Sequence, residues 1–437
     1  MMHANGRAAA RGRVLAVAVG LVLLAGCNDG SSPSTTTTIT TSATNTAAVT
    51  VGFGALGPSG GYVNGIWTSV IVCTPGSTTN CETIPNVLVD TGSYGLRILS
   101  SALTVSLPNV QIGGNALQEC VQFADFAYAW GPVASASVQI AGTDEKALQV
   151  PGQATNSGIP IHILAASPSA AVPSSCLATA PIAGEVLDLN TVESLGGNGI
   201  LGIGTEPQDC GAACVTESVP EYYICPGGAC SIAEVPLQQQ LWNPVAAFSS
   251  SDTNGILLTL PAVTATGAAS VTGSLIFGVG TQSNNQIGST QVYEVDEYAN
   301  FPKVVFNGVT YTSPDNGSFI DTGSEVIFFS DATSLASTGI VECSGNVQGL
   351  YCPASTIPFT VTPYGANNVH GTVQFNIANA SALFNTGNAA FNDMGGDSGS
   401  GPATDYLDLG LPFFLGRKVF VGVAGSNSSY PNGFWAF

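Results

Sequence analysis

The chain has 437 residues, of which 45% are hydrophobic and only 8% are charged, and its net charge at pH 7 is −20. This length accommodates two domains with their own cores, and so acidic a surface repels nucleic acid and anionic membranes. Few charges and 53 glycines exclude long amphipathic helices and favour many short strands joined by turns, an all-β protein.

Residues 1–26 have the pattern of a signal peptide. Arginines precede an apolar run at 14–24 that is short for a membrane span, and Leu24-Ala25-Gly26-Cys27 follows. This motif resembles a bacterial lipobox, which predicts a lipoprotein with a lipid on Cys27; the alternative is a plain secretory signal. Residues 27–47 are rich in Ser and Thr and are expected to be a flexible tether.

These features predict a location in a bacterial cell envelope. The protein would be attached to the membrane through the lipid on Cys27. Because Asn28, and not Asp, follows that cysteine, we expect the outer membrane, with the protein facing the periplasm or the exterior.

Apolar patterning predicts the elements of the first part of the chain. Residues 62–73 form one strand, and Asn86–Asp90 ends a second strand that is fully buried. Residues 118–142 are expected to form a hairpin, with 120–123 in one arm and 134–140 in the other. Apolar residues at helical spacing predict a short amphipathic helix at 236–248.

The later part of the chain continues the same alternation of strands and turns. We expect two strands within 255–280, a hairpin at 304–312 and a strand at 364–376. A short helix is predicted at 333–337, and 385–405 reads as a Gly-rich loop. The predicted fold is therefore all-β with a few short helices.

Ten cysteines follow Cys27, an even number that predicts disulfide bonds in an exported protein. We expect Cys73–Cys81 and Cys343–Cys352 as local loops and Cys120–Cys176 as a long-range bridge. Pairing within the remaining group is left open, and a four-thiolate zinc site is the minor alternative there; the group comprises Cys210, Cys214, Cys225 and Cys230.

One motif occurs twice. Asp90-Thr91-Gly92-Ser93 ends the buried strand in the first half, and Asp321-Thr322-Gly323-Ser324 repeats it in the second half, each followed by another apolar run. Internal repetition indicates two similar units related by a pseudo-twofold axis. Two aspartates related in this way can meet at the junction and share one proton, because like charges so close cannot both ionise.

At these residues the chain resembles the pepsin-like aspartic peptidases, over most of its length after about residue 48. Gly199–Gly204 is similar to the segment under the first active-site loop, Gly273–Gly278 to the strand that closes the first lobe, and Leu409–Arg417 to its counterpart in the second. The leader and the closing Leu-Pro-Phe-Phe-Leu-Gly-Arg run are also similar to a branch of bacterial lipoproteins labelled only as a domain of unknown function.

The resemblance implies a two-lobed fold with pseudo-twofold symmetry, with an N-terminal β lobe at 48–280 and a C-terminal β lobe at 281–437. It implies an aspartic endopeptidase that hydrolyses peptide bonds with a water activated between Asp90 and Asp321. It also implies the residues that support these aspartates, which are Thr91, Gly92, Ser93, Thr322, Gly323 and Ser324.

The same resemblance implies no metal and no organic cofactor, with a peptide or protein as substrate, and we expect a monomer. In such enzymes the hairpin is a flap that closes on the substrate. Tyr128 and Trp130 are the flap candidates here, and ordinary aromatic packing is the alternative for both. Two other functions stay open: an inactive pepsin-like lipoprotein that binds peptides or glycans between the lobes, and a purely structural envelope protein.

Three other patterns are interpreted as structural and not as catalytic or metal-binding sites. Gly396–Pro402 is similar to the nucleophile segment of trypsin-like peptidases, but neither His162 nor His370 lies in a matching motif for the base. We expect His162 to be packed or paired. A group of late acidic residues fits no standard calcium loop and is expected in a solvated loop; it comprises Asp393, Asp397, Asp405 and Asp408.

Overall fold

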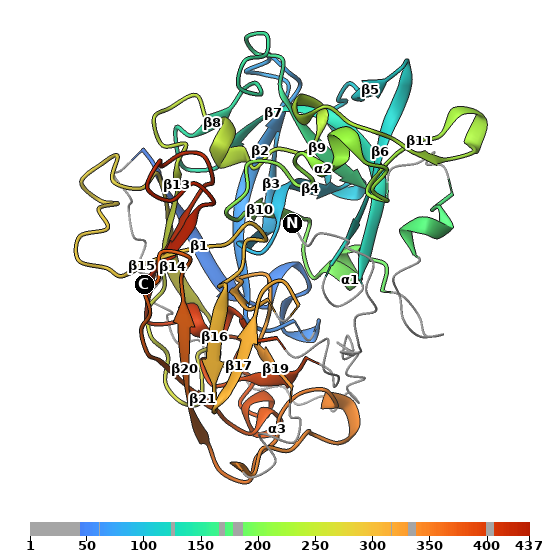
Figure 1. Ribbon diagram of the computed structural model, residues 1–437. Coiled ribbons are helices and arrows are strands. Elements are labelled where there is room, and N and C mark those ends of the chain that lie inside the picture. The colour runs from blue at the N-terminus through green and yellow to red at the C-terminus, as the bar shows by residue number, and fades with distance from the viewer. Residues whose placement is uncertain are drawn as a thin grey trace, which may run out of the picture.

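The computed structural model describes residues 44–437, except for 61, 124–126, 166–170, 178–186, 316, 331–337 and 399–405. The predicted signal peptide, Cys27, most of the tether and the helix expected at 333–337 lie outside the described residues. The rest of the chain consists mainly of β-strands with a few short helices, as the composition predicts (Figure 1).

The first fifteen strands belong to residues 46–294. They are β1 (Thr46–Gly52), β2 (Gly65–Cys73), β3 (Cys81–Asp90), β4 (Tyr94–Leu99), β5 (Gln111–Ile112), β6 (Asn115–Gln122), β7 (Tyr128–Ile140), β8 (Lys146–Ala147), β9 (Ile159–Leu164), β10 (Gly199–Ile203), β11 (Tyr222–Ile224), β12 (Ser231–Ile232), β13 (Gly255–Thr259), β14 (Val271–Phe277) and β15 (Val292–Glu294).

The later strands are β16 (Lys303–Phe306), β17 (Val309–Thr312), β18 (Phe319–Ile320), β19 (Ile327–Phe329), β20 (Ile357–Tyr364), β21 (Val373–Ile377), β22 (Gly395–Asp397), β23 (Asp408–Leu409), β24 (Lys418–Gly422) and β25 (Phe434–Ala436). The described α-helices are α1 (Val192–Leu195), α2 (Ala213–Thr216), α3 (Ala380–Phe384) and α4 (Leu411–Phe414). Within the described residues, no helix is long and apolar enough to cross a membrane.

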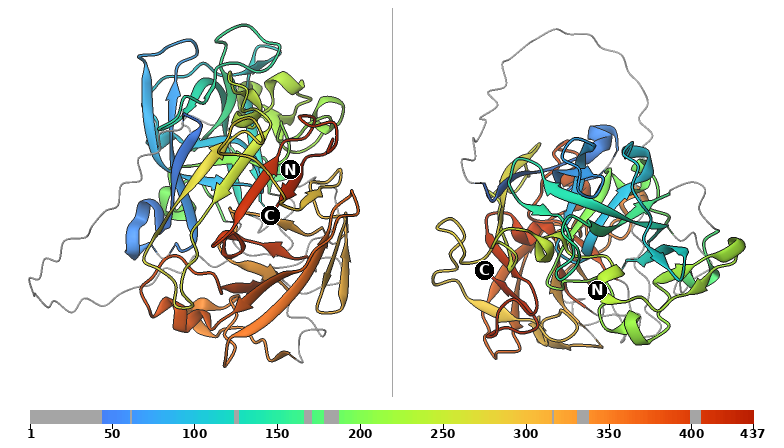
Figure 2. Two further views of the ribbon diagram at one scale, coloured as in Figure 1. Left: turned by 90° about the vertical axis from the view of Figure 1, so that its left-hand side faces the viewer. Right: turned by 90° about the horizontal axis from the view of Figure 1, so that it is seen from above.

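Strand pairings join seventeen of the described strands into one extended network. Its centre is β3, which pairs antiparallel with β2 and parallel with β10. β13 pairs with β14 on one side and with β24 on the other, and β25 pairs with β15. The last two strands therefore complete a sheet that otherwise belongs to the first 294 residues, and Figure 2 shows them beside it in two further views.

Two smaller sheets contain the remaining described strands. One has the order β17-β16-β20-β21, and the other has the order β18-β23-β19-β22. In Figure 1 the first of these lies below the large sheet. Its core is aromatic: Phe329 packs against Phe306, Phe359 and Phe375, with ring centroids 5.3 to 6.2 Å apart. These rings belong to the same continuous cluster of buried side chains as the large sheet, where the cluster is mostly aliphatic.

Five disulfides join all ten cysteines that the sequence places after Cys27. The predicted pairs Cys73–Cys81, Cys120–Cys176 and Cys343–Cys352 are confirmed. The four cysteines whose pairing was open form Cys210–Cys214 and Cys225–Cys230. The four-thiolate zinc alternative is therefore wrong, because disulfide sulfurs are not thiolate ligands.

Two predicted elements differ from the structure. Residues 236–248 form no amphipathic helix but two 3₁₀ turns, Leu237–Gln239 and Pro244–Ala247. Pro244 explains the difference, because proline lacks an N–H and interrupts a continuous helix. The strand expected at 364–376 is two strands, β20 and β21, separated by a turn in which Asn368 has φ of +62°. The predicted hairpin at 304–312 is confirmed as β16 and β17.

Candidate active site

Asp90 is the last residue of β3 and is only 5% exposed. The strand is buried because its neighbours cover it: Val87 to Asp90 pair with Gly199 to Gly202 of β10. Beyond β10, the backbone N–H of Gly204 donates to the Ser93 carbonyl at 3.0 Å. The segment predicted to pass under the first loop therefore does contact it.

The surroundings of Asp321 repeat this arrangement strand by strand. Around Asp90, β3 pairs parallel with β10, β10 pairs antiparallel with β4, and β4 pairs parallel with β9. Around Asp321, β18 pairs parallel with β23, β23 pairs antiparallel with β19, and β19 pairs parallel with β22. The repeated motif in the sequence thus lies on a repeated strand arrangement.

The two loops are joined by reciprocal hydrogen bonds. The backbone N–H of Thr91 donates to Thr322 Oγ1 at 3.1 Å, and the N–H of Thr322 donates to Thr91 Oγ1 at 3.0 Å. Thr322 Oγ1 also donates to the Val89 carbonyl at 2.7 Å. All of these atoms are buried, so the bonds hold two segments that are more than 200 residues apart in the sequence.

Each aspartate accepts hydrogen bonds from its own loop. The Gly92 N–H donates to Asp90 Oδ1 at 2.8 Å, and the Ser93 hydroxyl donates to Asp90 Oδ2. In the second loop the corresponding bonds go to Asp321, from the Gly323 N–H to Oδ1 at 2.7 Å and from the Ser324 hydroxyl to Oδ2 at 3.0 Å. These donors fix both carboxyl groups in orientation.

The glycines allow the two carboxyl groups to approach. A Cβ on Gly92 would lie 2.6 Å from Cγ of Asp321, and a Cβ on Gly323 would lie 2.7 Å from Oδ1 of Asp90. Both distances are shorter than van der Waals contact, so any larger residue would separate the loops. The glycine in each motif is thus required by the close approach of the opposite aspartate.

The pair is placed so that its two carboxyl groups cannot both ionise readily. Burial raises the pKa of Asp321 well above its usual value, and the negative charges of Asp90 and Asp408 raise it further, whereas the Gly323 N–H lowers it. Two carboxyl groups so close share protons as a pair, and the surroundings of Asp321 favour its neutral form. One carboxylate and one carboxylic acid is the arrangement that general acid–base chemistry needs.

A cavity of about 370 Å³ opens over the pair and is lined by both aspartates and both loops. Apolar side chains and acidic groups from both halves of the chain surround it. Arg97 is the one cationic residue among the described residues that line it. The cavity is large enough to hold an uncharged or cationic ligand against the two carboxyl groups.

Neither flap candidate lies in the described lining of this cavity. The predicted hairpin exists, with Cys120 opposite Trp130 and Gln122 opposite Tyr128, and its tip at 124–126 lies outside the described residues. Its side chains that line the cavity come from the first arm instead: Val121, Gln122 and Phe123.

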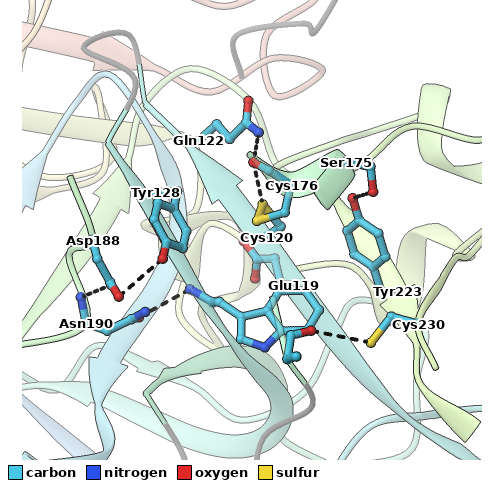
Figure 3. The surroundings of a disulfide bond; sticks show 12 residues. Glu119, Cys120, Gln122, Tyr128, Ser175, Cys176, Asp188, Asn190, Tyr223 and Cys230 are labelled. Carbon is cyan, nitrogen blue, oxygen red and sulfur yellow. Dashed lines mark hydrogen bonds between the residues drawn. A yellow bond between two sulfur atoms is a disulfide. The ribbon is translucent and has the colours of Figure 1, made fainter. Parts of the chain in front are cut away.

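Tyr128 lies in the surroundings of the Cys120–Cys176 disulfide (Figure 3), and Trp130 belongs to the same buried cluster. The Tyr128 hydroxyl donates to Asp188 Oδ2 at 3.3 Å, and the Trp130 ring lies edge-on to Tyr223 with 5.5 Å between centroids. The Gln122 amide donates to the Cys176 carbonyl in the same region. Both side chains thus lie in a buried cluster around the disulfide, and a role for either of them in a flap stays a prediction.

A buried ionic network next to the first loop was not predicted. Arg97 is 1% exposed and Glu119 is fully buried; Arg97 Nη2 lies 2.6 Å from Glu119 Oε1 and 3.6 Å from Asp209 Oδ2. Arg97 Nη1 also donates to the Tyr94 carbonyl at 2.7 Å, directly after the first motif. One feature of the sequence could have indicated this network. A single arginine lies within the apolar run 96–99, and a buried charge needs an oppositely charged partner.

The other members of the network hold its carboxyl groups. The Tyr222 hydroxyl donates to Asp209, and His162 Nδ1 lies 3.3 Å from Glu119 Oε2. Burial and the nearby Arg97 charge lower the pKa of His162 well below its usual value, so it is neutral. The prediction that His162 is packed or paired is confirmed. Oxygens of Glu119, Asp209 and Glu221 lie within 4.8 Å of one another, a possible cation site, but Arg97 already supplies the positive charge there.

The late acidic residues are not the solvated loop that the sequence predicted. Asp408 is 3% exposed and Asp393 is 4% exposed, while Asp405 lies outside the described residues. Asp408 lines the cavity, and the Ser324 hydroxyl lies 2.5 Å from its Oδ2. Asp397 lines the cavity as well, so the site contains two further carboxyl groups that the sequence analysis assigned to the surface.

Fold and site together define an all-β, disulfide-containing protein in which two Asp-Thr-Gly-Ser loops meet over one cavity. The chain belongs to the family described as protein of unknown function, DUF3443, whose model matches residues 41–437. A comparison with curated proteins found no match.

The bonds between the loops lead to a first prediction. Thr322→Val removes an oxygen that accepts from the Thr91 N–H and donates to the Val89 carbonyl. Leaving these buried groups unpaired should lower the free energy of unfolding by about 2 kcal/mol or more, measured by urea denaturation. The control is Thr310→Val on the exposed side of β17, which should change it little. Equal effects of the two substitutions would show that the reciprocal bonds contribute nothing.

Proposed function

We propose that the protein is an aspartic endopeptidase with a two-lobed, pepsin-like fold. The observation that carries the proposal is the meeting of Asp90 and Asp321, each held by its own glycine N–H and serine hydroxyl, over one cavity. Reciprocal threonine bonds join the loops, and the strand arrangement around each aspartate is the same. This supports a pseudo-twofold pair of lobes, with the dyad at their junction.

The proposed reaction uses one water held between the two carboxyl groups. Asp90, as carboxylate, removes a proton from the water while Asp321, as carboxylic acid, donates its proton to the carbonyl oxygen of the peptide. The water oxygen bonds to the carbonyl carbon and a tetrahedral intermediate forms. The proton now on Asp90 passes to the leaving nitrogen, the carbon–nitrogen bond breaks, and the hydroxyl proton returns to Asp321. The dyad is thereby restored.

The proposed setting is the surface of a bacterial membrane. The lipobox-like sequence at Cys27 supports a lipid anchor, and residues 27–47 would form the tether that holds the domain away from the membrane. Five disulfides support an oxidising compartment such as the periplasm or the cell exterior. A protein or peptide in that compartment would be the substrate.

Cleavage of a disordered protein tests the proposal. The full-length chain, purified in detergent, should cut denatured casein within the range from about pH 3 to pH 7, and a statine-type transition-state analogue should abolish the cutting. Tight binding of the analogue without cleavage would indicate a formed dyad with narrow specificity. Neither cleavage nor binding would contradict the proposal and favour an inactive protein that binds peptides or glycans in the cavity.

A further inference from the structure

Asp408 lies where the repeated strand arrangement has an aliphatic residue in its other copy. In the first half, Leu88 of β3 pairs with Ile200 of β10, two positions before Asp90. In the second half, Phe319 of β18 pairs with Asp408 of β23, two positions before Asp321. Ile200 and Asp408 both line the cavity. The second half therefore presents a carboxyl group at a place where the first half presents a hydrocarbon side chain.

The hydrogen bonds of Ser324 require an additional proton. Its Oγ lies 3.0 Å from Asp321 Oδ2 and 2.5 Å from Asp408 Oδ2. A hydroxyl has one hydrogen, so Ser324 can donate to only one of these two oxygens. Both contacts are hydrogen bonds only if the other carboxyl group carries a proton and donates it to Ser324. In the first loop the equivalent hydroxyl, that of Ser93, has Asp90 as its carboxyl partner.

The surroundings of Asp408 favour its protonated form. It is 3% exposed, and its Oδ1 has no hydrogen-bond partner within the described part of the chain. Burial raises the pKa of Asp408 well above its usual value; the Ser324 bond lowers it, and the charge of Asp90 raises it again. A carboxyl group so enclosed is more stable as the neutral acid.

No positive charge compensates these acids among the described residues of the cavity. The neighbouring strands β18 and β19 contain no ionisable side chain, and α4 contains none. The charged groups that line this end of the cavity are all acidic, and tyrosine hydroxyls line it too; the acids are Asp90, Asp321, Glu325, Asp397 and Asp408, and the tyrosines are Tyr298 and Tyr406. Arg97, the cation in the lining, is paired with Glu119. The site thus has more carboxyl groups than bound protons, and a proton bound by one of them is unavailable to its neighbours.

We propose that Asp408 is a third acid of the site. It holds a second proton, which is linked to Asp321 through Ser324, and it raises the pH up to which the dyad keeps its own proton. This inference rests on the proposed peptidase function. At low pH Asp408 is neutral and donates to Ser324, which donates to Asp321. When Asp408 ionises at higher pH, its negative charge raises the pKa of Asp321 and so opposes loss of the proton from that residue. Asp408 is a positioning residue, since it acts through Ser324 and Asp321.

The test is the pH profile of kcat/KM for a peptide that the wild type cleaves. Asp408→Asn keeps a donor for Ser324 but cannot acquire a charge, so Asp321 should lose its proton at lower pH. We expect the alkaline limb to move down by about one pH unit, a roughly tenfold loss of activity above the limb. The control is Asp393→Asn, a buried acid of the second half that does not line the cavity; its limb should stay in place.

The outcomes separate this inference from the proposed function. An unchanged alkaline limb in Asp408→Asn, with cleavage that still depends on Asp90, would overturn the inference and leave the peptidase intact. If the wild type cleaves nothing, the coupling is read from thermal melts at a series of pH values, for Asp408→Asn, Asp321→Asn and the double variant. A non-additive change in the pH dependence of Tm supports the coupling, and additive changes overturn it.

Discussion

Replacement of either dyad aspartate by asparagine is expected to abolish peptide hydrolysis and leave the protein folded. Asp90→Asn removes the base that takes the proton from water, and Asp321→Asn removes the acid that gives one to the carbonyl oxygen. Each should lower kcat/KM by about 10³-fold or more. The fold should persist because an asparagine oxygen still accepts from the N–H of Gly92 or Gly323.

Casein cleavage and the melting temperature together test this prediction. Casein cleavage should vanish in both variants, while the melting temperature at pH 6 to 7 should stay the same or rise, since one of two repelling acids is gone. Asp393→Asn is the control: it changes a buried acid of the second half that lies outside the cavity. Full activity in Asp90→Asn or in Asp321→Asn would contradict the dyad assignment.

The second large effect concerns stability. Arg97→Met should lower the free energy of unfolding by about 3–5 kcal/mol, because it leaves Glu119 and Asp209 buried without their positive partner. Guanidinium denaturation at neutral pH measures the loss. Burial raises the pKa of both carboxyl groups, so the loss should shrink as the pH falls and protons neutralise them.

Two further variants distinguish charge from packing. Adding Glu119→Gln to Arg97→Met removes one of the stranded charges and should recover part of the lost stability. Lys418→Met changes an exposed cation at the start of β24 and should have little effect. If Arg97→Met proves as mild as Lys418→Met, the network does not contribute to stability as we infer.

The sequence predicted mainly those features that depend on nearby residues or on a repeated motif. The disulfides that were predicted are the two local pairs, Cys73–Cys81 and Cys343–Cys352, and one long-range pair. The close approach of Asp90 and Asp321 could be predicted although they are far apart in the sequence, because the motif is repeated and repetition indicates symmetry. The all-β class followed from composition and from apolar alternation.

What could not be predicted depends on single side chains that meet across the fold. Arg97 meets Asp209, and Ser324 meets Asp408, with no spacing rule to connect them. Asp408 follows the Gly-rich stretch 385–405 and lies three residues after Asp405, a pattern typical of a surface loop. The pairing of β23 with β18 and β19 is what places Asp408 at the cavity. Local sequence patterns predict secondary structure, whereas these side-chain contacts depend on how the strands pack in the folded protein.

The strand pairings also determine when the site can form during synthesis. β1 pairs with β14 and β13 pairs with β24, so the large sheet closes only between segments made at widely separated times. A growing chain that has reached Ser324 contains both aspartates but lacks β23, which covers the second loop. Such long-range pairing is slow. If the proposed function holds, hydrolysis should therefore require that β23 and β24 have been made and paired.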